Sequence, residues 1–371
     1  MNNTSTKRAA LDLGLPIDQQ LLQTLVPVNV LTADHLKTLL RDRSIEVVCA
    51  GQSLFEKGEY DNQSIYLLSG QVKITDAQGE ERIVSAEDPA SRFPLEHFQP
   101  RRHSAAAVSD CSIVRFDSDQ LDAMLAWDQA SSYIILDISS QRDLDEDADW
   151  MLTLLKSNLF YKVPPMNIRE ILNKFKPVVL STGDVVMRQG EVGDCCYFIK
   201  EGLVGVYQSR DEKSSPELVA ELGVGRCFGE DALVNETVRN ATIEVHSNAV
   251  LMKIEKNDFF LLLKHPPVST VNLAQAQEQE REGRIWLDVR TLDEYEHGHY
   301  AGAMNMPLNL LKLKSRLLDR NRAYIVYCNS GRRSEAAAHF LGEEGFEVSV
   351  LVGGFCNYAA DQQRLFETDQ S

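Results

Sequence analysis

The sequence predicts a multidomain protein in which two all-β modules with flanking helices precede an α/β domain with a mostly parallel sheet. Short alternating apolar and polar segments, punctuated by glycine, recur in two separate stretches of the chain. The punctuating glycines have the same spacing in both stretches, which indicates an internal duplication. Beyond residue 269, strand-like and helix-like segments alternate instead, as they do in α/β domains.

The composition is that of a globular protein with room for two or three domains. The chain has 371 residues, of which 43% are hydrophobic and 25% are charged. A net charge of −17 argues against nucleic acid or an anionic membrane as the main partner. No apolar run is long enough to span a bilayer, and residues 1–10 lack the apolar stretch of a secretion signal. The seven cysteines include no C-x-x-C pair, so we expect no metal and a reduced, cytoplasmic protein.

The first β module is expected within residues 1–145. Residues 32–40 read as a short amphipathic helix with Thr32 as its cap. Residues 45–116 form short alternating segments separated by glycines, and residues 118–141 read as a long helix. The acidic run at residues 143–147 lies near the boundary and is interpreted as a solvated helix start.

The second β module, expected within residues 146–266, repeats this layout. Helices are predicted at 150–156 and 167–175, strands between 178 and 254, and a closing helix at 256–264. The duplication is visible in the glycine pairs Gly51 and Gly58, Gly183 and Gly190. Two prolines at 266 and 267 then end the module, because a helix cannot continue through them.

The C-terminal domain is expected within residues 267–371. Its predicted elements cover residues 285–289, 308–318, 324–327, 334–344 and 348–351. Strands that alternate with helices in this way indicate a mostly parallel sheet.

One segment of the second β module has the residues that a sugar phosphate requires. Gly229 lets the backbone turn sharply and bring N–H groups close to an anion. The carboxylate of Glu230 can accept hydrogen bonds from ribose hydroxyls, and the guanidinium of Arg239 can pair with a phosphate. The candidate binding residues of this segment, which we call the cassette, are Phe228, Gly229, Glu230, Asp231, Ala232, Leu233, Arg239, Asn240 and Ala241.

The cassette resembles the phosphate-binding segment of cyclic nucleotide-binding domains, which have a β-roll (jelly-roll-like) fold. The resemblance implies that Glu230 holds the ribose 2′-hydroxyl and that Arg239 holds the cyclic phosphate. Asn240, where the family usually has Ala, Ser or Thr, leaves the choice between cyclic AMP and cyclic GMP open, with cyclic AMP the favoured effector. The alternative is a β-roll that keeps the pattern for folding and binds nothing.

The first β module departs from this pattern. At the matching place Pro94 stands where glycine is needed, and proline lacks the N–H that the cradle requires. Arg101, Arg102 and His103 follow after too short a segment. They can bind some other anion or form a solvated basic turn, and we favour the turn. We therefore interpret this module as a degenerate copy used for packing, dimerisation or signal relay.

Cys328 is the main candidate functional residue of the C-terminal domain. A β-rich apolar run ends at Cys328, a short polar turn with Gly331 follows, and strong helix formers begin at Glu335. This order places a sulfur at a helix N-terminus among backbone N–H groups and two arginines, which favours a thiolate and holds an anion. The candidate residues of this cysteine loop are Cys328, Asn329, Ser330, Gly331, Arg332, Arg333 and Ser334.

The loop, together with three separated motifs, resembles single-domain rhodaneses, a sulfurtransferase family with a persulfide intermediate. The motifs are Leu287-Asp288-Val289-Arg290, Gly298-His299-Tyr300-Ala301-Gly302-Ala303 and Gly353-Gly354-Phe355, in which phenylalanine replaces the usual tryptophan. The resemblance implies a thiosulfate-type donor, a thiophilic acceptor and sulfur carried on Cys328. Asp288 and Arg290 are expected to pair, one loop arginine to turn inward, and His297 and His299 to be turn and core residues. Cys356 is either a second thiol or a packed core cysteine.

Three functional alternatives stay open. The chain is a cyclic nucleotide-regulated sulfurtransferase, or a non-catalytic signalling protein whose rhodanese-like domain is a docking platform, or a constitutive rhodanese with an empty cassette. Cysteine phosphatases need an arginine after five intervening residues, where this loop has Ser334, so phosphatase activity is disfavoured. The paired β modules also leave a homodimer open.

Overall fold

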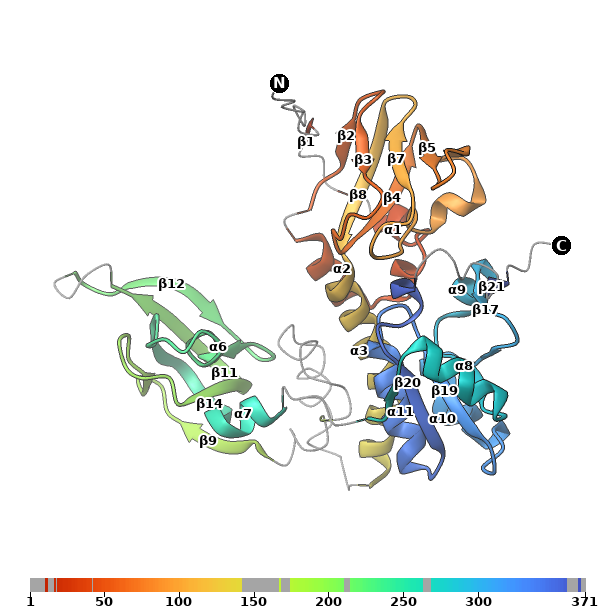
Figure 1. Ribbon diagram of the computed structural model, residues 1–371. Helices are drawn as coiled ribbons and strands as arrows, with labels where there is room; N and C mark the ends of the chain where they lie inside the picture. Colours follow the sequence, from red (N-terminus) through yellow and green to blue (C-terminus); the bar gives the residue numbers. More distant parts are fainter. Residues whose placement is uncertain are drawn as a thin grey trace. The chain divides into compact units, whose positions relative to one another are not determined.

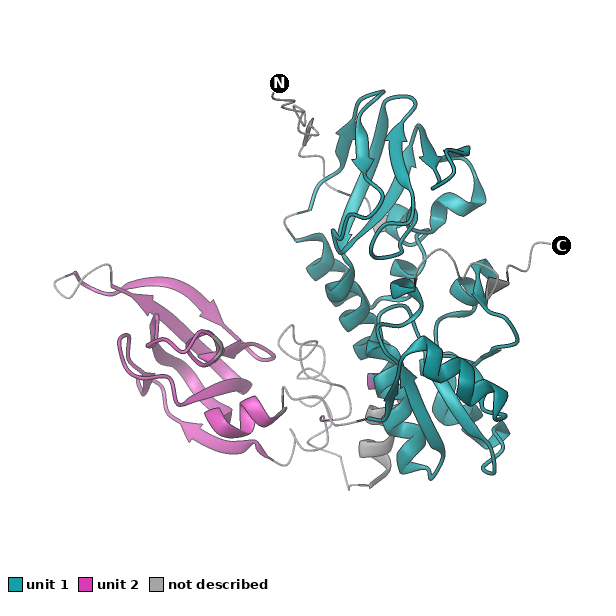
Figure 2. Ribbon diagram, viewed as in Figure 1, with its two compact units in different colours: residues 1–130, 268–371 teal, residues 131–267 magenta. Residues whose placement is uncertain are grey.

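The computed structural model describes residues 11–12, 17, 19–41, 43–141, 167, 174–209, 214–262, 268–358 and 366–367. The chain forms two compact units (Figure 2): residues 1–130 with residues 268–371, and residues 131–267. The first unit contains the first β module and the C-terminal domain, and the second contains the second β module (Figure 1).

The first β module has two four-stranded sheets among its described residues, in the orders β1-β2-β8-β4 and β3-β7-β5-β6. Its elements are β1 (Leu11–Asp12), α1 (Gln19–Leu22), η1 (Val28–Val30), α2 (Ala33–Leu40), β2 (Glu46–Val48), β3 (Ser53–Phe55), β4 (Gln63–Ser69), β5 (Gln71–Thr75), β6 (Glu81–Ser85), η2 (Pro89–Arg92), β7 (Ser104–Ala107), β8 (Cys111–Asp117) and α3 (Ser118–Gln141).

The sequence pattern explains this module well. The predicted helices at 32–40 and 118–141 are α2 and α3, and Thr32 is the N-cap residue of α2. Alternating residues of the strands, such as Val72 and Ile74, enter one buried apolar cluster, as expected when one face of a sheet packs on a core. Gly70 makes the tight turn between β4 and β5 at φ 86°, where a Cβ would lie 2.5 Å from the carbonyl oxygen of Asp110.

The second β module is an antiparallel sheet dominated by two long strands, β11 and β14, which pair along most of their length. Its described elements are β9 (Lys176–Leu180), β10 (Val185–Met187), β11 (Cys195–Gln208), β12 (Glu217–Leu222), β13 (Cys227–Phe228), α6 (Glu230–Val234), β14 (Thr242–Glu255) and α7 (Lys256–Leu262). The predicted helices at 150–156 and 167–175, and the acidic run at 143–147, fall largely outside the described residues.

The C-terminal domain has a five-stranded sheet in the order β15-β20-β19-β16-β18, and every pairing in it is parallel. Its described elements are β15 (Thr270–Val271), α8 (Leu273–Arg281), β16 (Ile285–Asp288), α9 (Leu292–His297), β17 (His299–Tyr300), β18 (Met304–Asn305), η5 (Leu308–Leu310), α10 (Leu311–Lys314), η6 (Ser315–Leu317), β19 (Ala323–Tyr327), α11 (Arg332–Glu343), β20 (Glu347–Leu351), η7 (Phe355–Asn357) and β21 (Phe366–Glu367).

Two local expectations for this domain need correction. Residues 308–318 were expected as one element but form three short helical turns, η5, α10 and η6. Helices α8 and α9 were not predicted, because α8 is mostly polar and α9 has only six residues. Both begin with a capping box, at Asn272 and at Thr291, which is the local signal that identifies them.

Within the first unit, the first β module packs against the C-terminal domain. Phe98 packs against the apolar cluster of the C-terminal domain that contains Tyr327 and Phe355. The amide of Gln99 donates to the carbonyl oxygen of Cys356 at 2.9 Å. This contact brings the segment that follows Pro94 next to the residues that border the cysteine loop.

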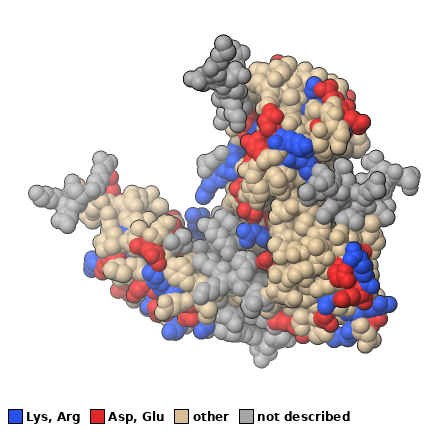
Figure 3. Space-filling view, viewed as in Figure 1, with Lys and Arg blue, Asp and Glu red and all other residues tan. Residues whose placement is uncertain are grey.

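The surface carries both signs of charge. On the face shown in Figure 3, acidic and basic side chains are intermixed. Among the described residues, none of the helices combines the length and the apolar character that a membrane crossing requires.

Candidate functional sites

Cys328 lies between the end of β19 and the start of α11, as the sequence pattern predicted. The amide N of Gly331 donates to the Cys328 Sγ at 3.1 Å, and the Ser334 Oγ lies 3.5 Å from the same sulfur. Gly331 is the N-cap residue of α11 at φ 115°, a left-handed conformation that only glycine adopts readily. The loop therefore turns a backbone donor towards the sulfur at the positive end of a twelve-residue helix.

A buried ion pair braces this loop from the inside. The Arg333 side chain is 0% exposed and donates to both carboxylate oxygens of Glu294, at 2.7 and 2.9 Å. Burial raises the pKa of Glu294, but the Arg333 guanidinium, together with Arg290 and the backbone of Thr291, outweighs it and lowers that pKa to about 2. One of the two loop arginines thus turns inward, as expected, while Arg332 stays partly exposed.

Glu294 also reaches the loop through Asn329, whose side-chain amide donates to its Oε1 at 2.8 Å. The predicted pair of Asp288 and Arg290 is confirmed, with 2.6 Å between Asp288 Oδ2 and Arg290 Nη2. Arg290 also donates to the Asn329 Oδ1 at 3.3 Å. Arg290 and Glu294, each a member of a buried ion pair, therefore both hydrogen-bond the side chain of Asn329.

The segment that begins with Gly353 and Gly354 holds the backbone of the cysteine loop. The amides of Phe355 and Cys356 donate to the carbonyl oxygens of Cys328 and Asn329, at 2.7 and 3.0 Å. A Cβ on Gly354 would lie 2.3 Å from the carbonyl oxygen of Cys328, so this close approach requires glycine. Burial raises the pKa of the Cys356 thiol well above its usual value, although the residue is partly exposed and lines a cavity together with Asn329 and Ser330.

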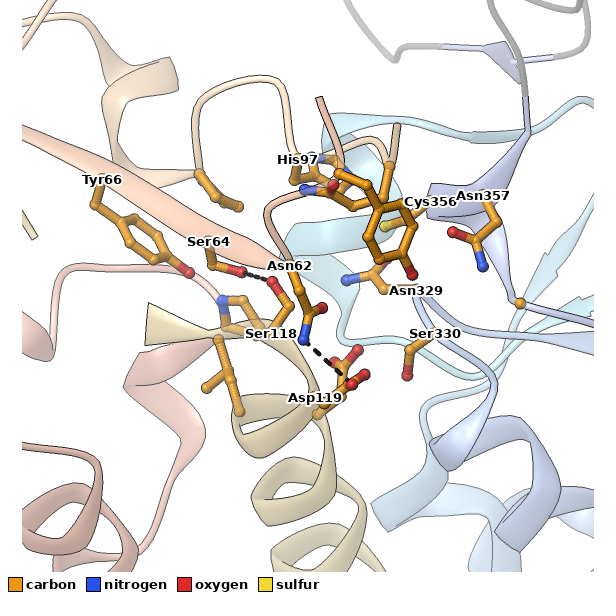
Figure 4. A pocket seen from close by; sticks show the side chains of 17 residues that line it. Asn62, Ser64, Tyr66, His97, Ser118, Asp119, Asn329, Ser330, Cys356 and Asn357 are labelled. Atoms are coloured by element: carbon orange, nitrogen blue, oxygen red, sulfur yellow. Dashed lines mark hydrogen bonds between the residues drawn. The ribbon is translucent and has the colours of Figure 1, made fainter. Parts of the chain in front are cut away.

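The sulfur is not accessible in this structure. Cys328 is 0% exposed. A cavity of about 100 Å³ lies between the loop residues Asn329 and Ser330 and the first β module, whose Asn62 and Asp119 face them across it (Figure 4). Asp122, on α3, lies 3.6 Å from Arg333. A sulfur donor can therefore reach Cys328 only after a local opening.

His297 and His299 are held by contacts with the rest of the first unit. His299 is buried, its Nδ1 is 2.9 Å from the carbonyl oxygen of Tyr295, and its ring stacks on that tyrosine. The ring of His297 stacks on Phe93 of the first β module, with 3.8 Å between centroids. These contacts agree with the expected turn and core roles.

The cassette of the second β module is built around Gly229, which precedes α6 at φ 87°. A Cβ on Gly229 would lie 2.8 Å from the Nη1 of Arg239. Arg239 is 3% exposed and donates to the carbonyl oxygens of Gly229 and Cys195 at 2.8 and 2.7 Å, and to the Asp194 Oδ1 at 3.1 Å. It lines a cavity of about 190 Å³ together with Glu230. The two residues that the sequence paired are therefore brought to one site.

The side chain of Glu230 fits a hydroxyl ligand. Its Oε2 is buried and accepts no hydrogen bond from the described residues. Burial is the main cause that raises the pKa of Glu230. A buried acceptor without a donor is costly, so this oxygen favours a ligand that donates a hydrogen bond. The other candidates divide by exposure: Phe228, Ala232, Leu233 and Ala241 are buried, whereas Asp231 and Asn240 are exposed.

The first β module contains a counterpart of Arg239 that the sequence comparison did not identify. The amide of Gly58 donates to the carbonyl oxygen of Arg101 at 2.8 Å, as that of Gly190 does to Arg239 at 2.9 Å. The Arg101 guanidinium is occupied by Asp61, at 2.9 Å, and by backbone carbonyls.

The interpretation of residues 101–103 as a solvated turn is wrong, because Arg101 and Arg102 are 1% and 6% exposed. Local polarity suggested solvent, but the module folds this turn onto its own core and onto the C-terminal domain.

Two residues that touch the loop were missed by the sequence analysis. Glu294 carries a local signal, the Thr291-x-x-Glu294 capping box, but that signal reports a helix start and not a partner for Arg333. Asp122 sits in a long helix and carries no local signal. Among the described residues, no group of three or more His, Cys, Asp or Glu side chains is arranged for a metal ion.

Comparisons with known proteins match three segments of the chain. The family model described as "Cyclic nucleotide-binding domain" matches residues 45–128 and 177–265, and that described as "Rhodanese-like domain" matches residues 272–361. A cyclic nucleotide-gated potassium channel of Rhizobium etli is 32% identical over 125 residues, 34% of this chain and 33% of the channel. Thiosulfate sulfurtransferase PspE of Escherichia coli is 37% identical over 76 residues, 20% of this chain and 73% of that protein.

The chain spans about a third of the length of the curated relatives that it matches first. Among solved structures, the regulatory domain of Toxoplasma gondii PKA with cAMP is 20% identical, with a TM-score of 0.29 over 71% of this chain and 94% of that chain. Both β modules thus match one family model and the C-terminal domain matches another, within one chain.

Proposed function

Because the chain belongs to the rhodanese-like family in residues 272–361 and carries two cyclic nucleotide-binding segments, we propose that it is a sulfurtransferase regulated by a cyclic nucleotide. The observation that carries the proposal is the N–H of Gly331 directed at the Cys328 Sγ, at the N-terminus of α11. A thiolate there gains a backbone hydrogen bond and the field of the helix.

The proposed reaction has two displacement steps. The Cys328 thiolate attacks the outer sulfur of thiosulfate, a new S–S bond forms, and the donor's S–S bond breaks with its electron pair leaving on sulfite. An acceptor such as a thiol or cyanide then attacks the outer sulfur of the persulfide, and the electron pair of that bond returns to Cys328. The N–H groups of residues 329–334 stabilise the anionic persulfide, and Arg333 fixes their positions through Glu294.

The nucleotide is assigned to the second β module. Glu230 accepts the ribose hydroxyl and Arg239 pairs with the cyclic phosphate, on the strength of their shared cavity and of the unsatisfied Glu230 Oε2. Cyclic AMP is the expected effector.

We propose that α3 couples the two sites. This helix places Asp122 near Arg333 and runs on to Gln141, towards the second β module in the chain.

The complete burial of Cys328 favours a second candidate, a non-catalytic signalling protein that uses the rhodanese-like domain for docking. The two candidates differ in whether sulfur is ever loaded onto the protein. A docking platform does not need an accessible thiolate, whereas a sulfurtransferase needs a state in which the loop opens.

Mass spectrometry of the full chain after incubation with thiosulfate separates these candidates. We expect an added sulfur on the peptide that contains Cys328, with a loading rate that changes when cyclic AMP is present. Asp122→Asn should load sulfur at a rate that cyclic AMP no longer changes. The absence of any persulfide, with and without nucleotide, would support the docking candidate and reject the enzyme.

Calorimetry should show that Arg239→Met binds cyclic AMP at least about thirtyfold more weakly than the unmodified protein, because a buried charge pairing with phosphate is lost. Arg188→Met, at an exposed arginine of the same module, is the matched control and should bind normally. Adenosine, which lacks the phosphate, should not distinguish Arg239→Met from the control. Equal affinity of both variants for cyclic AMP would contradict the assignment of Arg239.

A further inference from the structure

A second and larger cavity lies between the first β module and the C-terminal domain. Its volume is about 490 Å³. The first β module contributes Phe93 and Phe98 to its wall, and the C-terminal domain contributes Phe355, Arg290 and Glu294. Cys328 is not among its lining residues. The cavity therefore combines an aromatic lining with charged groups and is separate from the sulfur.

Arg102 is the unusual member of this lining. It is 6% exposed, yet its Nε and Nη2 make no hydrogen bond with any described residue. Its guanidinium carbon lies 3.5 Å from the centroid of the Phe98 ring. Burial lowers the pKa of Arg102 to about 10, so the side chain still carries its charge near neutral pH. A buried cation with unused donors is costly unless an anion meets it.

The acidic groups around the cavity are already engaged. Glu96 contacts Arg82 and His103, the latter at 2.6 Å, and Glu294 accepts both hydrogen bonds from Arg333. Among the described residues, no carboxylate forms an ion pair with Arg102. Among the described residues, the Arg102 guanidinium therefore has no counter-charge in contact. The carboxylates of Glu96 and Glu294, by contrast, are each paired with a basic side chain.

We propose that this cavity binds an organic anion, with a carboxylate or sulfonate group on Arg102 and an apolar or aromatic body against Phe93, Phe98 and Phe355. The aromatic walls suit a hydrophobic body, and the planar guanidinium suits a two-oxygen head group. This site goes beyond the proposed function, because neither sulfur transfer nor cyclic nucleotide binding uses it.

The geometry does not suit a cyclic nucleotide. Pro94 offers no N–H to a phosphate, and the carboxylate of Glu96 is taken by Arg82 and His103, so it is not available to a ribose. A smaller anion without a sugar fits the groups that remain.

The position of the site has a consequence for the cysteine loop. Arg290 and Glu294 line the cavity and also bond to Asn329, at 3.3 and 2.8 Å. An anion bound in this cavity would therefore contact residues that themselves contact the cysteine loop.

Calorimetry on the full chain tests the site with two probes of similar shape, benzenesulfonate and the neutral methyl phenyl sulfone. We expect the unmodified protein to bind benzenesulfonate and to bind the sulfone about ten- to a hundredfold more weakly, as expected for a lost charge-assisted contact. Arg102→Met keeps an apolar side chain of similar length and should bind benzenesulfonate as weakly as the sulfone. Arg43→Met, at an exposed arginine of the same module, should behave like the unmodified protein.

Three results would overturn the proposal: no binding of benzenesulfonate at millimolar concentration, equal affinity for the two probes, or equal affinity of Arg102→Met and Arg43→Met. If Arg102→Met does not fold, the two probes on the unmodified protein decide the question through hydrogen exchange. Benzenesulfonate, unlike the sulfone, should then slow exchange in residues 93–98, and protection confined to other segments counts against the site.

Discussion

Replacing Cys328 by serine is expected to reduce thiosulfate:cyanide sulfur transfer to background, a loss of at least about a thousandfold relative to the unmodified protein. The reaction needs a thiolate that attacks sulfur and then leaves from a persulfide, and a serine hydroxyl does neither at neutral pH. The substitution changes one atom in a site held by Gly331 and Phe355, so the fold should remain intact. Thiocyanate release under steady-state conditions measures the effect.

The matched controls are two other cysteines of the first unit. Cys356→Ser lies close to the loop, but burial raises the pKa of this thiol, so most of the transfer should remain. Cys49→Ser is exposed and far along the chain from the loop, and it should have no effect. If Cys328→Ser keeps its rate while Cys356→Ser loses it, the nucleophile has been assigned to the wrong residue.

Much of the fold could be predicted because its signals are local. The glycine spacing shared by the two β modules and the long apolar pattern of α3 are each visible within a short stretch of sequence. The same holds for the strand that ends just before Cys328 and for the pair of Asp288 and Arg290, which are two residues apart. Each of these features depends on chain neighbours, so reading along the sequence finds them.

The features that could not be predicted join residues that are distant in sequence. Arg333 pairs with Glu294, 39 residues earlier, and Asp122 contacts Arg333 from α3 of the first β module. The sequence shows that a loop arginine needs a partner when it is buried, but it does not show which carboxylate the fold brings there. The prediction for Arg102 was wrong for the same reason. A basic turn is expected to be solvated unless its packing against another domain is known.

Replacing Glu294 by glutamine is expected to destabilise the first unit by about 3–5 kcal/mol, because Arg333 is left as a buried charge without its main partner. Asn329 also loses its carboxylate acceptor, so the cysteine loop should loosen together with the fold. Urea unfolding followed by tryptophan fluorescence measures the loss, since Trp286 is buried in the same domain. Glu278→Gln is the matched control, because that glutamate is exposed and pairs with exposed Arg281, and its effect should stay within about 0.5 kcal/mol.

The pH dependence gives this prediction a second readout. The pKa of Glu294 is about 2 in the folded protein, below the value of 4.5 for a free glutamate side chain, so the unfolded chain takes up its proton first as pH falls. The stability that the ionised carboxylate contributes is therefore complete above about pH 4.5 and is lost as the pH falls towards 2. The difference in unfolding free energy between the unmodified protein and Glu294→Gln should shrink over that interval. A difference that stays constant from neutral pH to pH 2 would mean that Glu294 stabilises the loop by packing and not by its charge.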